Sequence, residues 1–131
     1  MHRAVRAPGW LLILLLLFAG ELQATSLRIE RDGLLTRLQQ PDLLILDVRS
    51  AAAYRKAHIP GAVNLPAALS YAEEEQGDII PPLRAQALFR QLGIDTDHNI
   101  VVYDGGELTA SARVLWLLEV YGLKQVKILN G

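Results

Sequence analysis

The chain has 131 residues, which is enough for one globular domain and too few for two. Hydrophobic residues make up 51% of it and charged residues 21%, so its composition excludes an intrinsically disordered chain. The formal net charge of -1 is too small to hold nucleic acid or an anionic membrane surface by electrostatics alone, so we expect no nucleic-acid partner. Because the chain contains no cysteine, disulfides and thiol catalysis within it are excluded as well.

The N-terminus has the three regions of a secretory signal peptide. Two arginines precede an apolar run at residues 10–19, and a short segment with small residues follows up to Ala24. The run is shorter than the roughly 18 residues needed to span a bilayer, and Glu21 closes it. We therefore expect cleavage after Ala24 and a mature chain that begins at Thr25, is exported to the periplasm or secreted, and has no stable membrane insertion. An uncleaved membrane anchor is the alternative.

Short apolar runs then alternate with amphipathic stretches, a pattern typical of an α/β domain with a mostly parallel sheet. Residues 27–29 predict a first short strand, after which Asp32 can cap a helix that ends at residues 39–41. This helix should place Leu34, Leu35 and Leu38 on one face. The continuous apolar run at 43–46 predicts a central strand covered by helices on both sides.

A short helix and a sharp corner are predicted next. Residues 50–57 are rich in alanine and favour a helix. In the corner, Pro60 favours an extended conformation at Ile59 and fixes its own φ, while Gly61 can adopt positive φ without a clash. A strand at 62–65 should follow.

The second half of the chain continues the alternation of helices and strands. The acidic stretch 71–78 predicts a solvated loop, and Pro82 suits the first turn of a helix that ends at Gly93. Residues 99–103 predict another buried strand, which Asp-Gly-Gly at 104–106 ends abruptly. A helix with a wide apolar surface follows, ended by Gly122 in the left-handed conformation, and a last strand is predicted at 126–129. The apolar surface of that helix is formed by Val114, Leu115, Leu117, Leu118 and Tyr121.

Two motifs at a fixed separation resemble a known family. Asp47-Val48-Arg49 follows the central strand, and His58-Ile59-Pro60-Gly61-Ala62 forms the corner. Together they resemble the rhodanese domain, and the similarity continues through Asp104-Gly105-Gly106 to Leu129-Asn130-Gly131. The resemblance implies a rhodanese-like α/β fold with a mostly parallel central sheet and helices on both faces. It also implies that the last helix of this fold is missing from the chain.

In the rhodanese family, the loop after the strand equivalent to 100–103 holds a catalytic cysteine that carries sulfur as a persulfide. The resemblance places Asp104 at that position. A carboxylate cannot replace the thiolate, because persulfide chemistry needs a polarizable sulfur that both attacks and leaves. Glu107 adds a second negative charge where single-domain members usually have glycine, which opposes the binding of a sulfur anion. We therefore assign no catalytic residue and predict that the chain alone is inactive. The equivalent of the active loop is Asp104, Gly105, Gly106, Glu107, Leu108 and Thr109.

The cysteine-less N-terminal domain of tandem thiosulfate/3-mercaptopyruvate sulfurtransferases has the same Asp-Gly-Gly turn. The resemblance thus implies that residues 25–131 are a noncatalytic rhodanese domain, truncated at its C-terminal end, with a catalytic rhodanese domain expected beyond Gly131 as its partner. The alternative is a stand-alone inactive rhodanese module that binds a partner protein. We expect no cofactor, and no metal because the histidines and carboxylates lack the spacing of metal ligands.

Several polar residues have both a structural and a functional interpretation. Asp47 and Arg49 can fix the turn after the central strand by charge-assisted hydrogen bonds, or they can contact a substrate at the strand end. His58 suits a corner residue that bonds local backbone better than it suits a base. The Asp104 carboxylate can accept local backbone N–H bonds, or it can exclude anions or bind a cation. Arg113 can face a cleft or the surface. We assign a structural motif to Asp47, Arg49, His58, Pro60 and Gly61.

Overall fold

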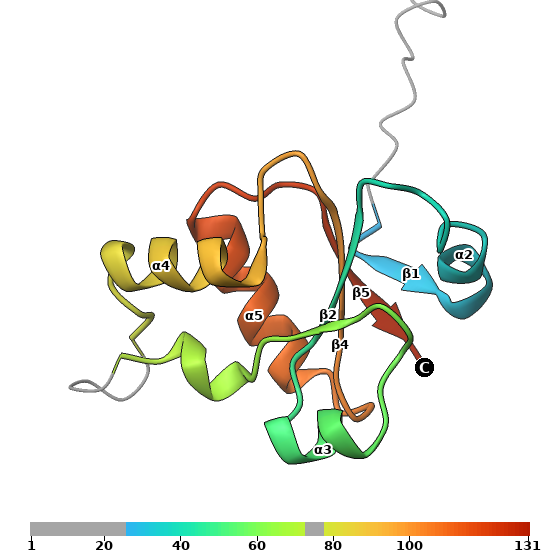
Figure 1. The fold of residues 1–131 in the computed structure, drawn as a ribbon, viewed down its shortest axis with the longest axis horizontal. Coiled ribbons are helices and arrows are strands. Elements are labelled where there is room, and N and C mark those ends of the chain that lie inside the picture. The colour runs from blue at the N-terminus through green and yellow to red at the C-terminus, as the bar shows by residue number, and fades with distance from the viewer. Residues whose placement is uncertain (1–25, 73–77) are drawn as a thin grey trace, which may run out of the picture.

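The structure, a computed structural model, describes residues 26–72 and 78–131. Its centre is a five-stranded sheet with strand order β1-β5-β4-β2-β3, in which every neighbouring pair is parallel (Figure 1). The strands are β1 (Arg28–Glu30), β2 (Leu43–Asp47), β3 (Val63–Asn64), β4 (Asn99–Tyr103) and β5 (Val126–Asn130). The predicted α/β class with a parallel sheet is therefore confirmed.

Helices cover both faces of the sheet. The helices are α2 (Arg31–Leu35), α3 (Ala51–Lys56), α4 (Pro82–Leu92) and α5 (Thr109–Val120), with a 3₁₀ helix, η1 (Ala67–Ser70), after β3. In Figure 1, α4 and α5 lie on one side of the sheet and α2 lies on the other. The five strands thus form the middle of three layers.

Alternate residues of the two middle strands supply the core on each face. On the side of α5, Leu46 of β2 and Val102 of β4 pack with Val114. On the opposite side, Ile45 and Val101 pack with residues that include Leu34 of α2 and Tyr54 of α3. A strand that is buried on both faces needs a continuous apolar run, which is the pattern at 43–46.

The predicted helix ends agree with the structure in the second half of the chain. Pro82 occupies the first turn of α4, and Gly93 ends that helix in the left-handed conformation with φ 71°. Gly122 follows α5 with φ 89°. Glycine suits both positions because a Cβ atom disfavours positive φ.

The prediction for the first helix is wrong in two respects. Asp32 does not cap α2, because Glu30, the last residue of β1, is the N-cap and the strand leads directly into the helix. The helix ends at Leu35, so the expected apolar face does not form: Leu34 is buried, whereas Leu35 is 51% and Leu38 40% exposed. The spacing of the leucines predicted too long a helix, because only one of the three packs into the core.

Other local differences concern short elements. The predicted strand 62–65 is reduced to the two residues of β3, and η1 was not predicted. Tyr71 forms an antiparallel bridge with Ile79, so the ends of the predicted loop 71–78 are held together, while residues 73–77 lie outside the described residues. The predicted signal peptide also lies outside them. Among the residues described, no helix has the length and apolar character needed to cross a membrane.

Candidate functional site

The C-terminal ends of β2 and β4 bring the predicted motifs to one edge of the sheet. The two strands are neighbours, and Asp47 pairs in register with Tyr103. The loop that begins at Asp104 follows directly. Ligands of open parallel sheets bind at this edge, outside the carboxyl ends of the strands, which makes it the candidate site.

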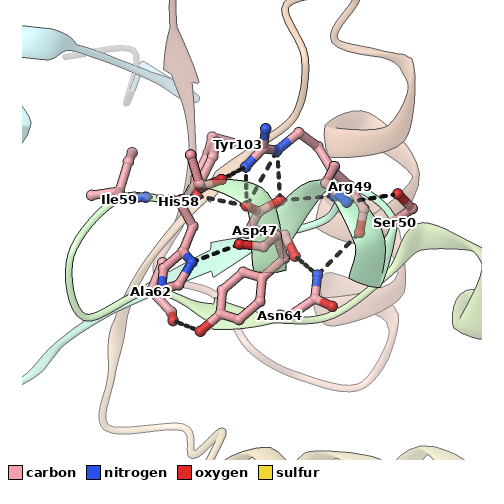
Figure 2. A network of polar contacts seen from close by, with 11 residues as sticks. Asp47, Arg49, Ser50, His58, Ile59, Ala62, Asn64 and Tyr103 are labelled. Atoms are coloured by element: carbon pink, nitrogen blue, oxygen red, sulfur yellow. Dashed lines mark hydrogen bonds and ion pairs between the residues drawn. The ribbon is translucent and has the colours of Figure 1, made fainter.

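Asp47 and Arg49 form a bidentate ion pair (Figure 2). Arg49 donates from Nη2 to Asp47 Oδ2 at 2.6 Å and from Nε to Oδ1 at 3.0 Å, and its backbone N–H donates to Oδ1 at 2.9 Å. Nη2 also donates to the carbonyl oxygen of Ala57 at 2.7 Å. The side chain of Asp47 is completely buried, so the guanidinium both neutralises it and ties it to the end of α3.

Tyr103 and Asn64 complete this network from two other strands. The Tyr103 hydroxyl donates to Asp47 Oδ2 at 2.7 Å and accepts the backbone N–H of Ile59 at 3.0 Å. Asn64 Nδ2 donates to the carbonyl oxygens of Asp47 and Arg49, at 2.9 and 3.0 Å. The Asp47 cluster, by which we mean Asp47, Arg49, Asn64 and Tyr103, therefore joins β2, β3, β4 and the corner after α3.

The charges of the Asp47 cluster shift the pKa values of its members. Burial alone would raise the pKa of Asp47, but the hydrogen bonds from Arg49 and Tyr103 outweigh it and hold that pKa below its usual range. The bond to Asp47 raises the pKa of Arg49. Burial is the largest cause of a raised pKa at the Tyr103 hydroxyl, and the neighbouring Asp47 carboxylate raises this pKa further. The cluster therefore holds a fixed ion pair and a neutral phenol, none of which is poised to exchange a proton near neutral pH.

His58 makes the local backbone contact that its position in the corner led us to expect. Its Nδ1 donates to the carbonyl oxygen of Tyr54 at 2.7 Å, and its ring stacks on that of Tyr54 with centroids 3.7 Å apart (Figure 2). The Tyr54 hydroxyl donates to the carbonyl oxygen of Ala62 at 2.6 Å, across the corner. Gly61 has φ 82°, the positive value that the corner requires. The contacts of His58 therefore serve the corner, which Pro60 and Gly61 shape.

The Asp104 carboxylate accepts hydrogen bonds from three backbone N–H groups. Oδ1 accepts from Gly106 at 2.9 Å and from Leu108 at 3.2 Å, and Oδ2 accepts from Ser111 at 3.0 Å. Gly106 and Leu108 both have positive φ, 112° and 64°, which turns the loop around the carboxylate. Burial raises the pKa of Asp104, but the bonds from Ser111, Gly106 and Leu108 outweigh it and leave that pKa lowered. These are the local backbone bonds expected of an Asp-Gly-Gly turn.

The sequence pattern around this loop singled out Glu107 but not Ser111. Ser111 is completely buried, and its hydroxyl has no hydrogen-bond partner of ordinary geometry, although it helps to lower the pKa of Asp104. Glu107 is exposed, and its Oε2 lies 2.9 Å from where a Cβ atom on Gly105 would be. Two carboxylates therefore belong to the loop, one held inside it and one over its surface. The described residues contain no group of three or more acidic or histidine side chains that could hold a metal ion.

Arg113 holds the segment before α4 in place by hydrogen bonds. Nε donates to Ser70 Oγ at 3.2 Å, and Nη2 donates to the carbonyl oxygens of Ser70 and Asp78, at 3.2 and 2.9 Å. Its guanidinium lies 4.1 Å from the ring centroid of Tyr71 and 5.0 Å from that of Trp116. Sequence periodicity missed this role because the partners are up to 43 residues away. His98 lies in the turn before β4, where its Nδ1 accepts the Asp95 N–H at 3.1 Å.

The fold and this site define a parallel α/β domain whose candidate loop joins a buried strand to a helix N-terminus. The model of the rhodanese-like domain matches residues 30–131, and the chain belongs to this family. Two curated relatives are sulfurtransferases. The chain is 31% identical over 120 residues to the 3-mercaptopyruvate sulfurtransferase of Escherichia coli, covering 82% of this chain and 43% of that protein. It is 36% identical over 105 residues to the thiosulfate sulfurtransferase of Azotobacter vinelandii, covering 79% and 39%.

Solved structures agree with these relatives. The chain superposes on the crystal structure of SseA from Escherichia coli, described as showing the rhodanese fold of 3-mercaptopyruvate sulfotransferases. The TM-score is 0.69 and the identity 30%, over 79% of this chain and 40% of that one. An anaerobic ergothioneine biosynthesis enzyme from Chlorobium limicola matches with a TM-score of 0.66 and 25% identity, over 80% of this chain and 24% of that one. The chain thus spans about two fifths of the length of the first curated relatives.

Proposed function

We propose that this chain is the noncatalytic N-terminal domain of a tandem sulfurtransferase that acts on thiosulfate or 3-mercaptopyruvate. Catalysis would come from a cysteine in a second rhodanese domain beyond Gly131. The role of the present domain would be to pack against the catalytic domain and form one wall of its cleft. The observation that carries the proposal is Asp104, a carboxylate held by three backbone N–H groups in the loop after β4.

The chemistry of the loop supports the noncatalytic part of this proposal. Sulfur transfer needs a thiolate as nucleophile and leaving group, and the chain has no cysteine. The carboxylate that stands there is already bonded to the backbone, and its lowered pKa keeps it charged at neutral pH. An ionised carboxylate repels a sulfur anion, so the loop opposes both the chemistry and the binding of the substrate.

The lengths of the relatives support the tandem part. The sulfurtransferases of Escherichia coli and Azotobacter vinelandii continue well beyond the matched region, since this chain covers 43% and 39% of them. A second domain of similar size would account for that difference. We further propose export through the signal peptide at residues 1–24, with the mature protein in the periplasm or secreted and not stably inserted in a membrane.

A stand-alone inactive module that binds a partner protein is the second candidate. The observation in its favour is a group of exposed large side chains on η1, on the residue that follows it and on α5. Trp116 is 45% exposed, Tyr71 44% and Leu69 48%, and the Arg113 guanidinium lies 4.1 Å from the ring centroid of Tyr71 and 5.0 Å from that of Trp116. Tryptophan, tyrosine and arginine are the residues most enriched at the energetic centres of protein interfaces.

The coding sequence downstream of Gly131 separates the two candidates. A second unit with the Asp-x-Arg and His-Ile-Pro-Gly-Ala motifs and a cysteine in its loop would favour the tandem enzyme and count against the stand-alone module. A stop codon directly after Gly131 would do the reverse.

Enzyme assays test the noncatalytic assignment itself. Thiocyanate formation from cyanide with thiosulfate, and separately with 3-mercaptopyruvate, would be measured for the parent chain and for Asp104→Cys. We expect no turnover in the parent and some in the variant, because the variant supplies the missing nucleophile. Turnover in the cysteine-free parent would overturn the proposal, and silence in both would favour a purely structural loop.

A further inference from the structure

A cavity lies between α4, the turn at residues 93–98 and the segment that follows α5. Its volume is about 790 Å³. Both helices cover the same face of the sheet (Figure 1). The cavity is separate from the candidate site at the strand ends, because no residue of the Asp47 cluster or of the loop that begins at Asp104 lines it. Small-molecule sites in proteins are usually clefts of roughly 300–1,000 Å³, so this cavity has the size of one.

The apolar walls of the cavity are held in place by contacts within the fold. Phe89 and Tyr121 meet edge to face, with ring centroids 6.0 Å apart. The Tyr121 hydroxyl donates to the carbonyl oxygen of Ile80, and the N–H of Ile94 donates to that of Phe89 at 2.8 Å. Leu83 also lines the cavity and is 80% exposed. The cavity therefore offers preformed aromatic walls and an apolar rim that a ligand can cover.

Two nitrogen donors line the same cavity without an acceptor of their own. Arg90 is exposed, and among the residues that the structure describes its guanidinium forms no ion pair or hydrogen bond. The Nδ1 of His98 accepts the N–H of Asp95 at 3.1 Å, so a neutral imidazole here carries its proton on Nε2. Within the described part of the chain, no group accepts this Nε2–H. Both groups are thus available to an external acceptor.

The acidic residue at the cavity is already engaged within its own turn. Asp95 Oδ1 accepts the N–H of Thr96 at 2.6 Å and its hydroxyl at 3.2 Å. The backbone of Asp95 is tied to His98 at both its N–H and its carbonyl oxygen. The turn is therefore fixed, and the Asp95 carboxylate does not pair with the guanidinium of Arg90.

We propose that this cavity is a binding site for an aromatic carboxylate. The ring of the ligand packs against Phe89, Tyr121 and Leu83, because aromatic rings favour edge-to-face and offset contacts with one another. Its carboxylate accepts from Arg90 and from His98 Nε2, since a guanidinium fork matches the two oxygens of a carboxylate. A neutral aromatic compound leaves Arg90 without an anion, and a small acid leaves the apolar walls uncovered. The site thus requires both halves of the ligand.

This inference does not depend on the proposed function. The tandem enzyme and the stand-alone module both contain the cavity, and binding there involves no sulfur transfer. A failure to bind would therefore leave both candidates for the function as they stand.

The test titrates the full 131-residue chain with 2-naphthoate and follows the backbone N–H resonances of residues 93–96 by NMR. Two comparison ligands separate the halves of the site: 2-naphthamide has the rings without the charge, and acetate has the charge without the rings. Sodium chloride holds the ionic strength constant.

Three variants assign the carboxylate contacts. Arg90→Gln removes the guanidinium, and His98→Asn removes Nε2 while it keeps an acceptor close to the position of Nδ1. Arg84→Gln is the matched control, because it removes the same charge from the same helix at a residue that does not line the cavity.

We expect saturable shifts with 2-naphthoate, about tenfold weaker binding of 2-naphthamide, and no saturation with acetate. Arg90→Gln should weaken 2-naphthoate binding about tenfold, which corresponds to one lost charge-assisted hydrogen bond, and His98→Asn about threefold. Arg84→Gln should bind as the parent does. Absence of saturation with 2-naphthoate, equal binding of the amide, or equal weakening by Arg90→Gln and Arg84→Gln would each overturn the proposal. Shifts that depend on protein concentration alone would also do so, because a second copy of the chain would then cover the cavity.

A second measurement needs only the parent chain. Nuclear Overhauser effects should join the protons of bound 2-naphthoate to the rings of Phe89 and Tyr121 and to the methyl groups of Leu83. Effects to the exposed rings of Tyr71 and Trp116 in their place would put the ligand on another surface and contradict the proposed site.

Discussion

Two aspartates stand at the ends of neighbouring strands and are stabilised in different ways. Asp47 ends β2, and Asp104 follows the last residue of β4. Both carboxylates have lowered pKa values. For Asp47 the bonds that lower it come from the side chains of Arg49 and Tyr103 and from one backbone N–H, whereas for Asp104 most come from backbone N–H groups.

The sequence separation of the partners explains what each aspartate does for the molecule. Tyr103 is 56 residues from Asp47, so their bond ties two strands and the corner after α3 into one unit. The partners of Asp104 lie within seven residues of it. The first arrangement stabilises the fold, and the second shapes one loop. Asp104, whose partners lie within its own loop, can therefore be replaced by another residue without disrupting the sheet.

The largest effect should come from Asp47→Asn. This variant leaves Arg49 without its anion beside a buried amide, and breaking a buried ion pair typically costs about 3–5 kcal/mol of the free energy of unfolding. Urea denaturation followed by circular dichroism measures the loss. The matched control is Asp97→Asn, an exposed position, which should stay within about 0.5 kcal/mol of the parent. Equal stability of the two variants would mean that the Asp47 cluster does not hold the strands together.

Asp104→Ala should cost less, about 2 kcal/mol, because it leaves backbone donors unsatisfied near the surface but breaks no long-range contact. The same denaturation measurement applies, with Glu107→Gln as the control from the same loop. Hydrogen exchange adds a spatial readout: the N–H groups of Gly106 and Leu108 should lose protection, while those of β2 and β4 keep theirs. A loss of protection across the sheet would contradict the local role of Asp104.

Much of the fold could be predicted from the sequence because it depends on local patterns. The apolar runs at 43–46 and 100–103 supply buried residues to the cores on both faces of the sheet, and Gly93 and Gly122 end their helices with positive φ. The backbone bonds of Asp104 follow from turn chemistry. The first helix was overestimated because the spacing of its leucines does not reveal that only Leu34 finds a packing partner.

The rest of the site could not be predicted because its contacts join distant segments. Nothing in the sequence pairs Tyr103 with Asp47 or Arg113 with Ser70, although the placement of Tyr103 at the end of the strand beside β2 becomes informative once the strand order is known. Ser111 is a small polar residue in a helix, and such residues are mostly exposed. Its burial is visible only when α5 lies on the sheet.

Tyr103→Phe should reduce the free energy of unfolding by about 1 kcal/mol. The ring still fills its place, but Asp47 loses one donor and the N–H of Ile59 loses its acceptor. Arg49 remains to neutralise the carboxylate, which is why the effect should be smaller than that of Asp47→Asn. Denaturation of the single variants and of Tyr103→Phe/Asn64→Ala would show whether the members of the cluster act together, since independent contacts give additive losses.

The smallest difference should lie between the acid sensitivities of the parent and of Asp104→Asn. Because the pKa of Asp104 is lower in the folded chain than in the unfolded one, its contribution to stability is complete above the unfolded value of about 4 and is lost as pH falls through the folded value. The parent should therefore lose more stability than Asp104→Asn below about pH 4, and the two should run parallel from there to neutral pH. Urea midpoints measured between neutral pH and strong acid would test this. Identical acid profiles would show that the loop does not favour the charged form of the Asp104 carboxylate. The loop would then use Asp104 only to turn the chain, and its N–H groups would not stabilise an anion.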